Sequence, residues 1–218
     1  KADPNIIFND LVKNINDPDF NFIALSNSTG IKSYVISDTN IATVVGSNVT
    51  IQNLGSTLVT INQAADSNYN SGSSTMTLKI ITDPIINFDD ITKIFGEANF
   101  ELTPSSTSSA PFTFTISNTS IATLSGSNVT IQNTGSTTIF VKQEAYENFA
   151  EASASIVLTI LKAEPKIILS EIVKTYGDSD FEIYPTSNSN GQFSFTIENP
   201  TIASINENKV SILQAGVT

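Results

Sequence analysis

The segment Ile41–Gly55, IATVVGSNVTIQNLG, indicates the architecture of the chain because it returns almost unchanged as Ile121–Gly135, IATLSGSNVTIQNTG. Twelve of the fifteen positions are identical at a spacing of 80 residues, and a weaker third copy, IASINENKVSILQAG, begins at Ile202 after a spacing of 81. Self-similarity at a fixed period indicates a repeat architecture. Other landmarks keep the same registers: Pro4, Pro84 and Pro165; Lys13, Lys93 and Lys174; Phe20, Phe100 and Phe181. We therefore expect three modules, which we call module 1 (1–82), module 2 (83–162) and module 3 (163–218), the last of them incomplete.

Within each module the apolar residues recur with a period of two. Val49 and Ile51 flank Thr50, while Met76, Leu78 and Ile80 alternate with polar residues. The same alternation is found at Ile6/Phe8, Phe20/Phe22, Tyr34/Ile36 and Val59/Ile61. Such alternation predicts strands with one buried face, and no segment of useful length has the period of an amphipathic helix. About seven short strands per module predict an all-β fold, namely tandem immunoglobulin-like antiparallel β-sandwiches in an elongated array.

The composition excludes several kinds of chemistry. The chain has no Cys, His, Trp or Arg, whereas Asn, Ser and Thr together make up about a third of it. Cysteine nucleophiles, Ser-His-Asp triads and tetrahedral zinc sites all need side chains that are missing. A net charge of −11 with scattered lysines argues against nucleic acid and anionic membrane surfaces as partners, and no apolar run is long enough to span a bilayer. We expect a non-enzymatic protein without catalytic residues, cofactor or metal.

The core must form without a disulfide. Phe20, Tyr34 and Tyr69 are therefore expected to supply much of the buried area, because each aromatic side chain can cover roughly 150–250 Å².

Three motifs resemble a known family. Lys174–Phe181, KTYGDSDF, resembles the opening of the MBG-type bacterial Ig-like repeats, while Ile41–Gly55 resembles the bacterial immunoglobulin-like group 2 domains and Gln63–Tyr69 a late segment of that family. The resemblance covers the whole chain and implies Ig-like sandwiches, found in tandem in secreted adhesins, cell-surface proteins and some phage or viral particle proteins. It implies no catalytic residues. Module 1 departs from the family pattern at Asn16, whose position is occupied by Gly96 in module 2 and by Gly177 in module 3. We expect Asn16 to adopt a left-handed backbone conformation as glycine does.

Paired acidic positions precede the recurring phenylalanine. These positions hold Asp17 and Asp19, Glu97 and Asn99, and Asp178 and Asp180. Oxygen ligands two residues apart could begin a Ca²⁺ site, although the same pattern is typical of a turn that leads into a strand. We favour the turn, because Glu97 with Asn99 is a weak ligand set.

Three other patterns have a functional and a structural interpretation. The recurring lysines Lys13, Lys93 and Lys174 would suit a Lys–Asn isopeptide only if the last strand offered an Asn, whereas it offers Leu78 and Leu158; an edge lysine is the simpler interpretation. Asp89-Asp90 could suggest a glycosidase carboxylate pair, but adjacent strand residues face opposite ways and only the second acid recurs. Glycosylation sequons stand at Asn27, Asn48, Asn118 and Asn128, no more than chance predicts in so Asn-rich a chain.

The end of the chain leaves module 3 without two strands. The counterparts of Ile139–Val141 and Ile156–Ile160 would lie beyond Thr218. We expect the natural chain to continue, the alternative being that a neighbouring subunit donates the missing strands.

The repeat suggests a structural function. We expect a stalk or spacer in an extracellular or cell-surface protein or adhesin, as part of a longer chain or larger assembly. One alternative is a decoration or fibre protein on the surface of a virus or phage particle. Another is a module that binds a glycan or receptor through the variable region 64–74.

Overall fold

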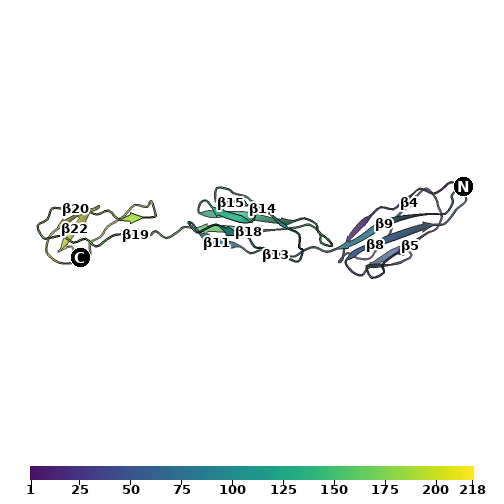
Figure 1. Ribbon diagram of the computed structural model, residues 1–218, viewed down its shortest axis with the longest axis horizontal. Coiled ribbons are helices and arrows are strands. Elements are labelled where there is room, and N and C mark those ends of the chain that lie inside the picture. Colours follow the sequence, from purple (N-terminus) through teal and green to yellow (C-terminus); the bar gives the residue numbers. More distant parts are fainter. The chain divides into compact units, whose positions relative to one another are not determined.

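The computed structural model describes all residues, 1–218, and contains strands but no helices (Figure 1). This confirms the predicted all-β class. The chain divides into two compact units, Lys1–Leu161 and Lys162–Thr218, which are described separately. The first unit holds two copies of the repeat, and each copy has its own hydrophobic cluster.

Module 1 is a sandwich of two sheets. One sheet has the order β2-β9-β8-β5, and the other has the order β3-β7-β6, extended by the pair β1-β4. The strands are β1 (Ile6–Ile7), β2 (Leu11–Asn14), β3 (Phe20–Asn21), β4 (Leu25–Ser26), β5 (Lys32–Ile36), β6 (Ala42–Val45), β7 (Asn48–Ile51), β8 (Gly55–Gln63) and β9 (Gly72–Ile81). The short strands β3 and β4 are two parts of one extended run, and the turn Gly46-Ser47 joins β6 to β7.

Module 2 repeats this arrangement with the sheets β11-β18-β17-β14 and β12-β16-β15 and the pair β10-β13. Its strands are β10 (Ile86–Asn87), β11 (Ile91–Ile94), β12 (Phe100–Glu101), β13 (Ser105–Ser106), β14 (Phe112–Ile116), β15 (Ala122–Ser125), β16 (Asn128–Ile131), β17 (Gly135–Gln143) and β18 (Ala152–Leu161).

One strand pairing in each of modules 1 and 2 is parallel, which the predicted antiparallel sandwich did not include. The first extended segment changes sheets at Asn9-Asp10, so that β1 pairs with β4 while β2 runs parallel to β9, with Leu11 opposite Leu78 and Lys13 opposite Ile80. Strands β11 and β18 pair in the same way. The physical reason is that β2 enters and β9 leaves the sandwich in the same direction.

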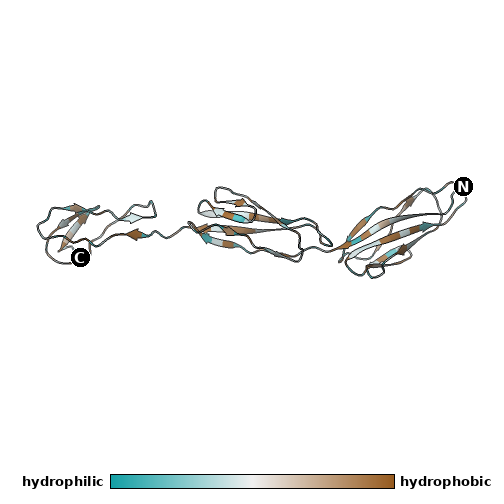
Figure 2. Cartoon of the chain, in the orientation of Figure 1, coloured by the Kyte–Doolittle hydropathy of each residue, from teal (hydrophilic) through white to brown (hydrophobic).

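The buried residues match the predicted alternation, which Figure 2 shows as bands of contrasting hydropathy along β8 and β9. Val59, Ile61, Leu78 and Ile80 are fully buried. The buried aromatic residues of module 1 are Phe8 and Phe22, with Phe20 and Tyr34 partly buried against them, while Tyr69 lies outside this cluster. The expectation for Tyr69 was therefore wrong, because its segment forms an isolated bridge with Ala2 instead of a core strand.

The two modules of the first unit are joined without spacer residues. Strand β9 ends at Ile81, and the next residue, Thr82, already exchanges backbone hydrogen bonds with Asn148 and Ala150 of module 2, both 2.9 Å long. Ala2 makes the equivalent bonds to Asn68 and Asn70 in module 1. Thr82 therefore enters module 2 as Ala2 enters module 1.

The second unit contains fewer strands. A three-stranded sheet β20-β23-β22 and a pair β19-β21 are present. Their bounds are β19 (Ile167–Ile168), β20 (Phe181–Glu182), β21 (Thr186–Ser187), β22 (Ala203–Asn206) and β23 (Lys209–Ile212). The segments 172–175 and 193–197, counterparts of β11 and β14, form no strand. In module 2 these strands pair with β18 and β17, which have no counterparts among residues 162–218.

Candidate functional site

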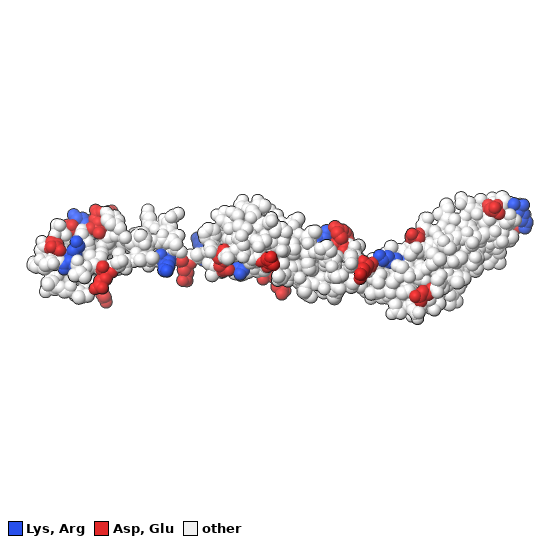
Figure 3. All heavy atoms as spheres, viewed as in Figure 1, with Lys and Arg blue, Asp and Glu red and all other residues white.

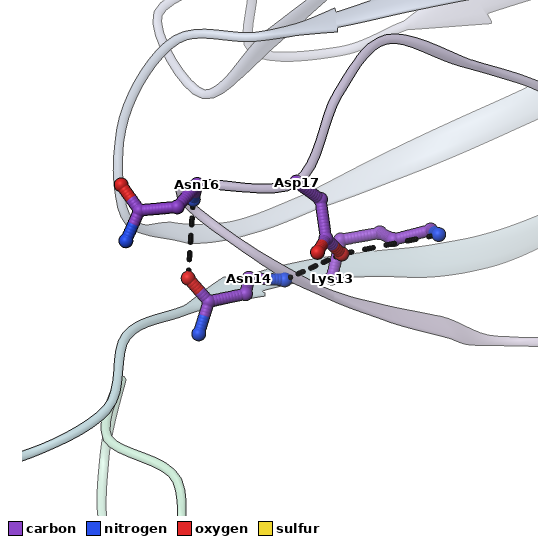
Figure 4. A network of polar contacts seen from close by, with 4 residues as sticks. All are labelled: Lys13, Asn14, Asn16 and Asp17. Carbon is purple, nitrogen blue, oxygen red and sulfur yellow. Dashed lines mark hydrogen bonds and ion pairs between the residues drawn. The ribbon is translucent and has the colours of Figure 1, made fainter.

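The recurring lysine lies near the end of β2, beside the compact turn that leads to β3 (Figure 4). The carboxylate of Asp17 accepts a hydrogen bond of 3.0 Å from the backbone N–H of Asn14, and Lys13 Nζ lies 3.9 Å from the same oxygen. The ammonium group of Lys13 also lies 4.9 Å from the centre of the Phe20 ring, within the range of a cation–π contact. The three residues thus stabilise one another and the turn.

The other modules repeat the unit. Lys93 lies over Phe100 at 5.2 Å, and Lys174 lies over Phe181 at 5.1 Å. The backbone N–H of Ile94 and the ammonium group of Lys93 hold the pKa of Glu97 below its usual value. No asparagine of the last strand stands beside Lys13, whose strand partner is Ile80, so the neighbours of this lysine are an acid and an aromatic ring.

The expectation for Asn16 was wrong. Gly96 and Gly177 have φ angles of +93° and +99°, whereas Asn16 does not have a positive φ. The side-chain oxygen of Asn14 instead accepts a hydrogen bond of 3.1 Å from the Asn16 N–H. This bond, which Ile94 and Thr175 at the corresponding position do not make, supports a different turn.

The acidic pairs before β3 and β20 have separate partners. Asp17 binds the turn, while Asp19 accepts hydrogen bonds from Asn48 Nδ2 and Thr50 Oγ1 on β7. In module 3, Asp180 takes the place of Asp19 and forms an ion pair of 3.1 Å with Lys209. The structure places these acids as links to neighbouring backbone and strands, and no group of three or more acidic side chains gathers that could hold a metal ion.

Asp90 has a structural position at the point where the first extended segment changes sheets. Its carboxylate accepts a hydrogen bond of 2.7 Å from the Val157 N–H, and Asp10 accepts one of the same length from Thr77. Of the pair Asp89-Asp90, only Asp90 binds the backbone of β18. This structural role explains why only the second acid recurs.

A buried glutamine organises the loop between β4 and β5. Gln63 Nε2 donates hydrogen bonds to the carbonyl oxygens of Ser28 (2.9 Å) and Gly30 (3.0 Å), and its Oε1 accepts one of 2.6 Å from the Ser26 hydroxyl. The side chain is 1 % exposed. A buried amide that uses both its ends holds the loop to the sandwich. Sequence reasoning did not single out Gln63, although it continues the inward register of Val59 and Ile61.

The module 2 counterpart is only half satisfied. Gln143 Nε2 donates to the carbonyl oxygens of Ser108 and Ala110, but its Oε1 is buried without a partner. Ser106, which occupies the position of Ser26, does not bond to it. The difference coincides with a change of loop sequence from Gly30-Ile31 to Ala110-Pro111.

Asp66 closes the same loop in module 1. Donation from the backbone N–H groups of Asn68 and Tyr69, from the Ser28 hydroxyl and from the Thr29 N–H holds the pKa of Asp66 far below its usual value. The distances are 2.8 Å in each case. The donors prefer the ionised carboxylate, so they tie the two loops at this end of the module together.

We expect Asp66→Asn to destabilise module 1 at neutral pH, because an amide cannot accept from all these donors. A carboxyl group whose pKa is lower in the folded state stabilises the fold at a pH above its pKa in the unfolded state, which is about 3.9 for Asp. This stabilisation is lost as the pH falls towards the pKa of the folded state. The difference in the free energy of unfolding of module 1 between the two proteins should therefore be constant above about pH 5 and shrink below about pH 4. Hydrogen exchange of module 1 amides from pH 3 to 7 measures it, with module 2 as the internal control. A gap that did not change with pH would contradict this role.

The region 64–74 differs from its counterpart in module 2, as its sequence indicated. Tyr146 stands at the position of Asp66, is 45 % exposed and exchanges backbone hydrogen bonds with Phe149. Lys142 forms ion pairs with Glu144 (3.0 Å) and Glu151 (3.2 Å), which raise its pKa. Modules 1 and 2 thus close this loop with different polar contacts.

A groove opens in module 1 where β1 and β2 separate. It has a volume of about 470 Å³ and is lined by residues 7–11 and Lys13 of the first extended segment, by residues 20–23 and Leu25, and by Met76 from β9. Phe8, Phe20 and Phe22 supply aromatic walls, and the charged side chains along it are Asp10 and Lys13. The alternation pattern could not reveal this groove, which follows from the change of sheets at Asn9-Asp10.

No family model matches the chain, and neither does any curated protein. Among solved structures, the chain resembles Drosophila OTK, extracellular domains 3–5, with a TM-score of 0.50 at 8 % identity over 72 % of this chain and 61 % of that one. The match to Sidekick-1 immunoglobulin domains 1–5 covers 95 % of this chain and 52 % of that one, with 11 % identity and a TM-score of 0.44. The match to the titin I-band fragment I67–I69 covers 96 % of this chain and 87 % of that one, with 12 % identity and a TM-score of 0.41. The likeness to OTK concerns the fold alone: the chain is built of tandem Ig-like domains.

No part of the chain forms a helix long and apolar enough to cross a membrane.

Proposed function

We propose that the chain is a non-enzymatic spacer in an extracellular surface protein, built of bacterial-type Ig-like modules that carry tension. The observation that carries this proposal is the path of the chain through a module. It enters at Ala2, beside the start of β9, and leaves at Ile81, the end of β9. Because β9 has ten residues, each module advances the chain by about 33 Å.

The parallel pair β2-β9 supports a load-bearing role. A pull on the two ends of a module draws β2 and β9 in opposite directions along their length. The hydrogen bonds between them, such as Ile15 N–H to Ile81 O at 2.8 Å, are then loaded together instead of one after another. Strands that must break several bonds at once resist tension better than strands that unzip.

The surface also suits a spacer. Charged residues make up only 14 % of the chain, and Figure 3 shows acidic and basic side chains scattered over a mostly uncharged exterior. Hydroxyl and amide groups keep such an exterior hydrated. The binding of an unidentified glycan or receptor by region 64–74 has less support, because in module 1 this loop directs its acid inward to its own backbone.

Single-molecule stretching of the whole chain, held at its two ends, tests the proposal. We expect two high-force ruptures, from modules 1 and 2. Each should lengthen the chain by about 250 Å, because about 80 residues extend by up to about 3.6 Å each and the folded module already spans about 33 Å. Ile15→Pro removes the bond to Ile81 and should lower the rupture force of module 1. The module 2 rupture, with its intact Phe95–Leu161 bond of 2.9 Å, is the matched control. Ruptures at low force, or equal forces in the variant, would contradict a tensile role.

A further inference from the structure

The chain contains three peptide bonds between an aspartate and a proline, and one between a glutamate and a proline in module 3. They are Asp3-Pro4, Asp17-Pro18, Asp83-Pro84 and Glu164-Pro165. The bond after an aspartate is sensitive to acid for two reasons. The side-chain carboxyl can form a five-membered ring with its own main-chain carbonyl carbon, and the proline nitrogen belongs to a tertiary amide, which accepts a proton more readily than an ordinary amide. Each Asp-Pro bond therefore carries the groups that self-cleavage needs.

The cleavage requires only the side chain, a proton and water. An oxygen of the aspartate carboxylate attacks the carbon of the residue's own main-chain carbonyl and forms a C–O bond, while the C–N bond to proline breaks. The proline nitrogen keeps the bonding electron pair and takes a proton from the acid, and the aspartate becomes a cyclic anhydride. Water then opens the anhydride and restores the side-chain carboxyl beside a new C-terminal carboxyl. A carboxylate that accepts hydrogen bonds from the fold must give them up before it can turn towards its carbonyl.

Two of the three aspartates are held in place by module 1. The carboxylate of Asp17 accepts the 3.0 Å hydrogen bond from the Asn14 N–H, and Lys13 Nζ lies 3.9 Å from the same oxygen. The carboxylate of Asp3 accepts a hydrogen bond of 2.9 Å from Asn70 Nδ2. These contacts keep both side chains from attacking their own carbonyl groups.

Asp83 occupies the position of the first aspartate in module 2, but nothing holds its side chain. The side chain is exposed and accepts no hydrogen bond from the folded chain. The residue that corresponds to Asn70 is Ala150, which has no side-chain donor. The backbone is nevertheless the same at both places, because the Ala150 N–H bonds to Thr82 O at 2.9 Å and the Asn70 N–H bonds to Ala2 O at 2.8 Å. The two module entries therefore differ in whether an amide side chain holds the aspartate.

No neighbouring charge replaces the missing amide. The charged side chains of the adjoining segments are Lys79 on β9 and Glu147 and Glu151 between β17 and β18, and none of them forms an ion pair with Asp83. Glu151 is instead paired with a lysine of β17. Pro84 is buried in module 2, so the leaving side of the bond is fixed while the attacking side chain is exposed to acid and able to turn.

We propose that Asp83-Pro84 is an acid-triggered self-cleavage site between modules 1 and 2, with the Asp83 carboxylate as its nucleophile. The cut falls between two separately packed cores, so each of these modules keeps its core after cleavage. Thr82 leaves with module 1, and the two hydrogen bonds that tie it to the segment before β18 are too few to hold the products together. Acid thus releases module 1 from the rest of the chain.

Mass spectrometry of the whole chain after incubation in acid tests the proposal. The incubation uses the lowest pH at which circular dichroism shows the strands unchanged. We expect fragments 1–83 and 84–218 to form at least about fivefold faster than fragments 1–17 and 18–218, because Asp17 must first give up its hydrogen bond. In concentrated urea at the same pH the three Asp-Pro bonds should be cut at similar rates, since the contacts that distinguish them are gone. The Glu164-Pro165 bond should stay intact in both solutions, because a glutamate would have to form a larger ring.

Exchanging residues between the two module entries supplies the matched variants. Ala150→Asn gives Asp83 the amide that Asn70 gives Asp3, and it should slow the cut after Asp83 at least about threefold. Asn70→Ala should speed the loss of residues 1–3 by a similar factor. Asp83→Glu copies module 3 and should abolish the cut between modules while keeping the charge. Circular dichroism of each variant at the incubation pH checks that its strands are intact.

The proposal is overturned if the folded chain is cut equally fast after Asp17 and after Asp83. It is also overturned if the cut after Asp83 occurs only in urea, or if Ala150→Asn and Asn70→Ala both fold and leave the rates unchanged. None of these outcomes depends on the stretching experiment, so the cleavage and the spacer function can fail separately.

Discussion

Replacing Gly30 with alanine should destabilise module 1 by at least about 2–3 kcal/mol, although module 2 has an alanine at the same position. A Cβ atom on Gly30 would lie 1.8 Å from the carbonyl oxygen of Ala64 and 2.9 Å from its carbon. Both atoms belong to the backbone just after β8, so no side-chain rotation can relieve the overlap. The loop would have to leave its place, and it would break the bond from Gln63 to the Gly30 carbonyl as it did so.

The control is the reverse substitution in module 2. The loop that contains Ala110 follows a different path. Module 1 has a hydrogen bond of 2.9 Å from the Ala64 N–H to the Ile31 carbonyl oxygen, and module 2 has no corresponding bond. Ala110→Gly should therefore change stability by less than about 1 kcal/mol, mostly through the unfolded chain. Urea unfolding followed by hydrogen exchange assigns each effect to its module. If Gly30→Ala were neutral, the close approach to Ala64 would not exist in solution.

The second large effect concerns the buried glutamines, which should not be equivalent. Gln63→Leu leaves the carbonyl oxygens of Ser28 and Gly30 and the hydroxyl of Ser26 without their partner. Each buried group left unsatisfied costs about 1–3 kcal/mol, and water can reach part of this loop, so we expect a total of about 2–4 kcal/mol.

Gln143→Leu is the matched comparison. It removes two hydrogen bonds but also removes the buried Oε1 that has no partner, which is itself unfavourable. We expect a loss of about 1–2 kcal/mol in module 2, clearly smaller than in module 1. Equal losses, measured by the same module-resolved exchange, would show that Gln143 Oε1 is satisfied in solution.

The sequence predicted the strands of modules 1 and 2 well because alternation is a local property. Val59, Ile61, Leu78 and Ile80 face inward as their spacing required. The parallel pairing of β2 with β9 could not be predicted, because alternation tells which face is buried and not which strand lies alongside. The unpaired segments 172–175 and 193–197 have the right alternation too, yet a strand also needs a neighbour for its backbone groups.

The candidate sites were predicted less completely. Recurrence singled out Lys13 and the second acid of the Asp89-Asp90 pair, but their partners, the Phe20 ring and the Val157 N–H, are known only once the chain is folded. Gln63 carried a signal that could have been used, namely a polar residue in an inward register.

The way Thr82 follows Ile81 has a consequence for the history of the chain. Thr82 occupies the position in module 2 that Ala2 occupies in module 1, and each of these modules has a separate core. No linker of matching length lies between them. A block of 80 residues can therefore be duplicated or deleted between the near-identical segments 41–55 and 121–135, and the resulting junction between modules has the same contacts as the existing one. Unequal recombination at those stretches would change the number of blocks, so length is the property of this molecule that can vary most freely among descendants.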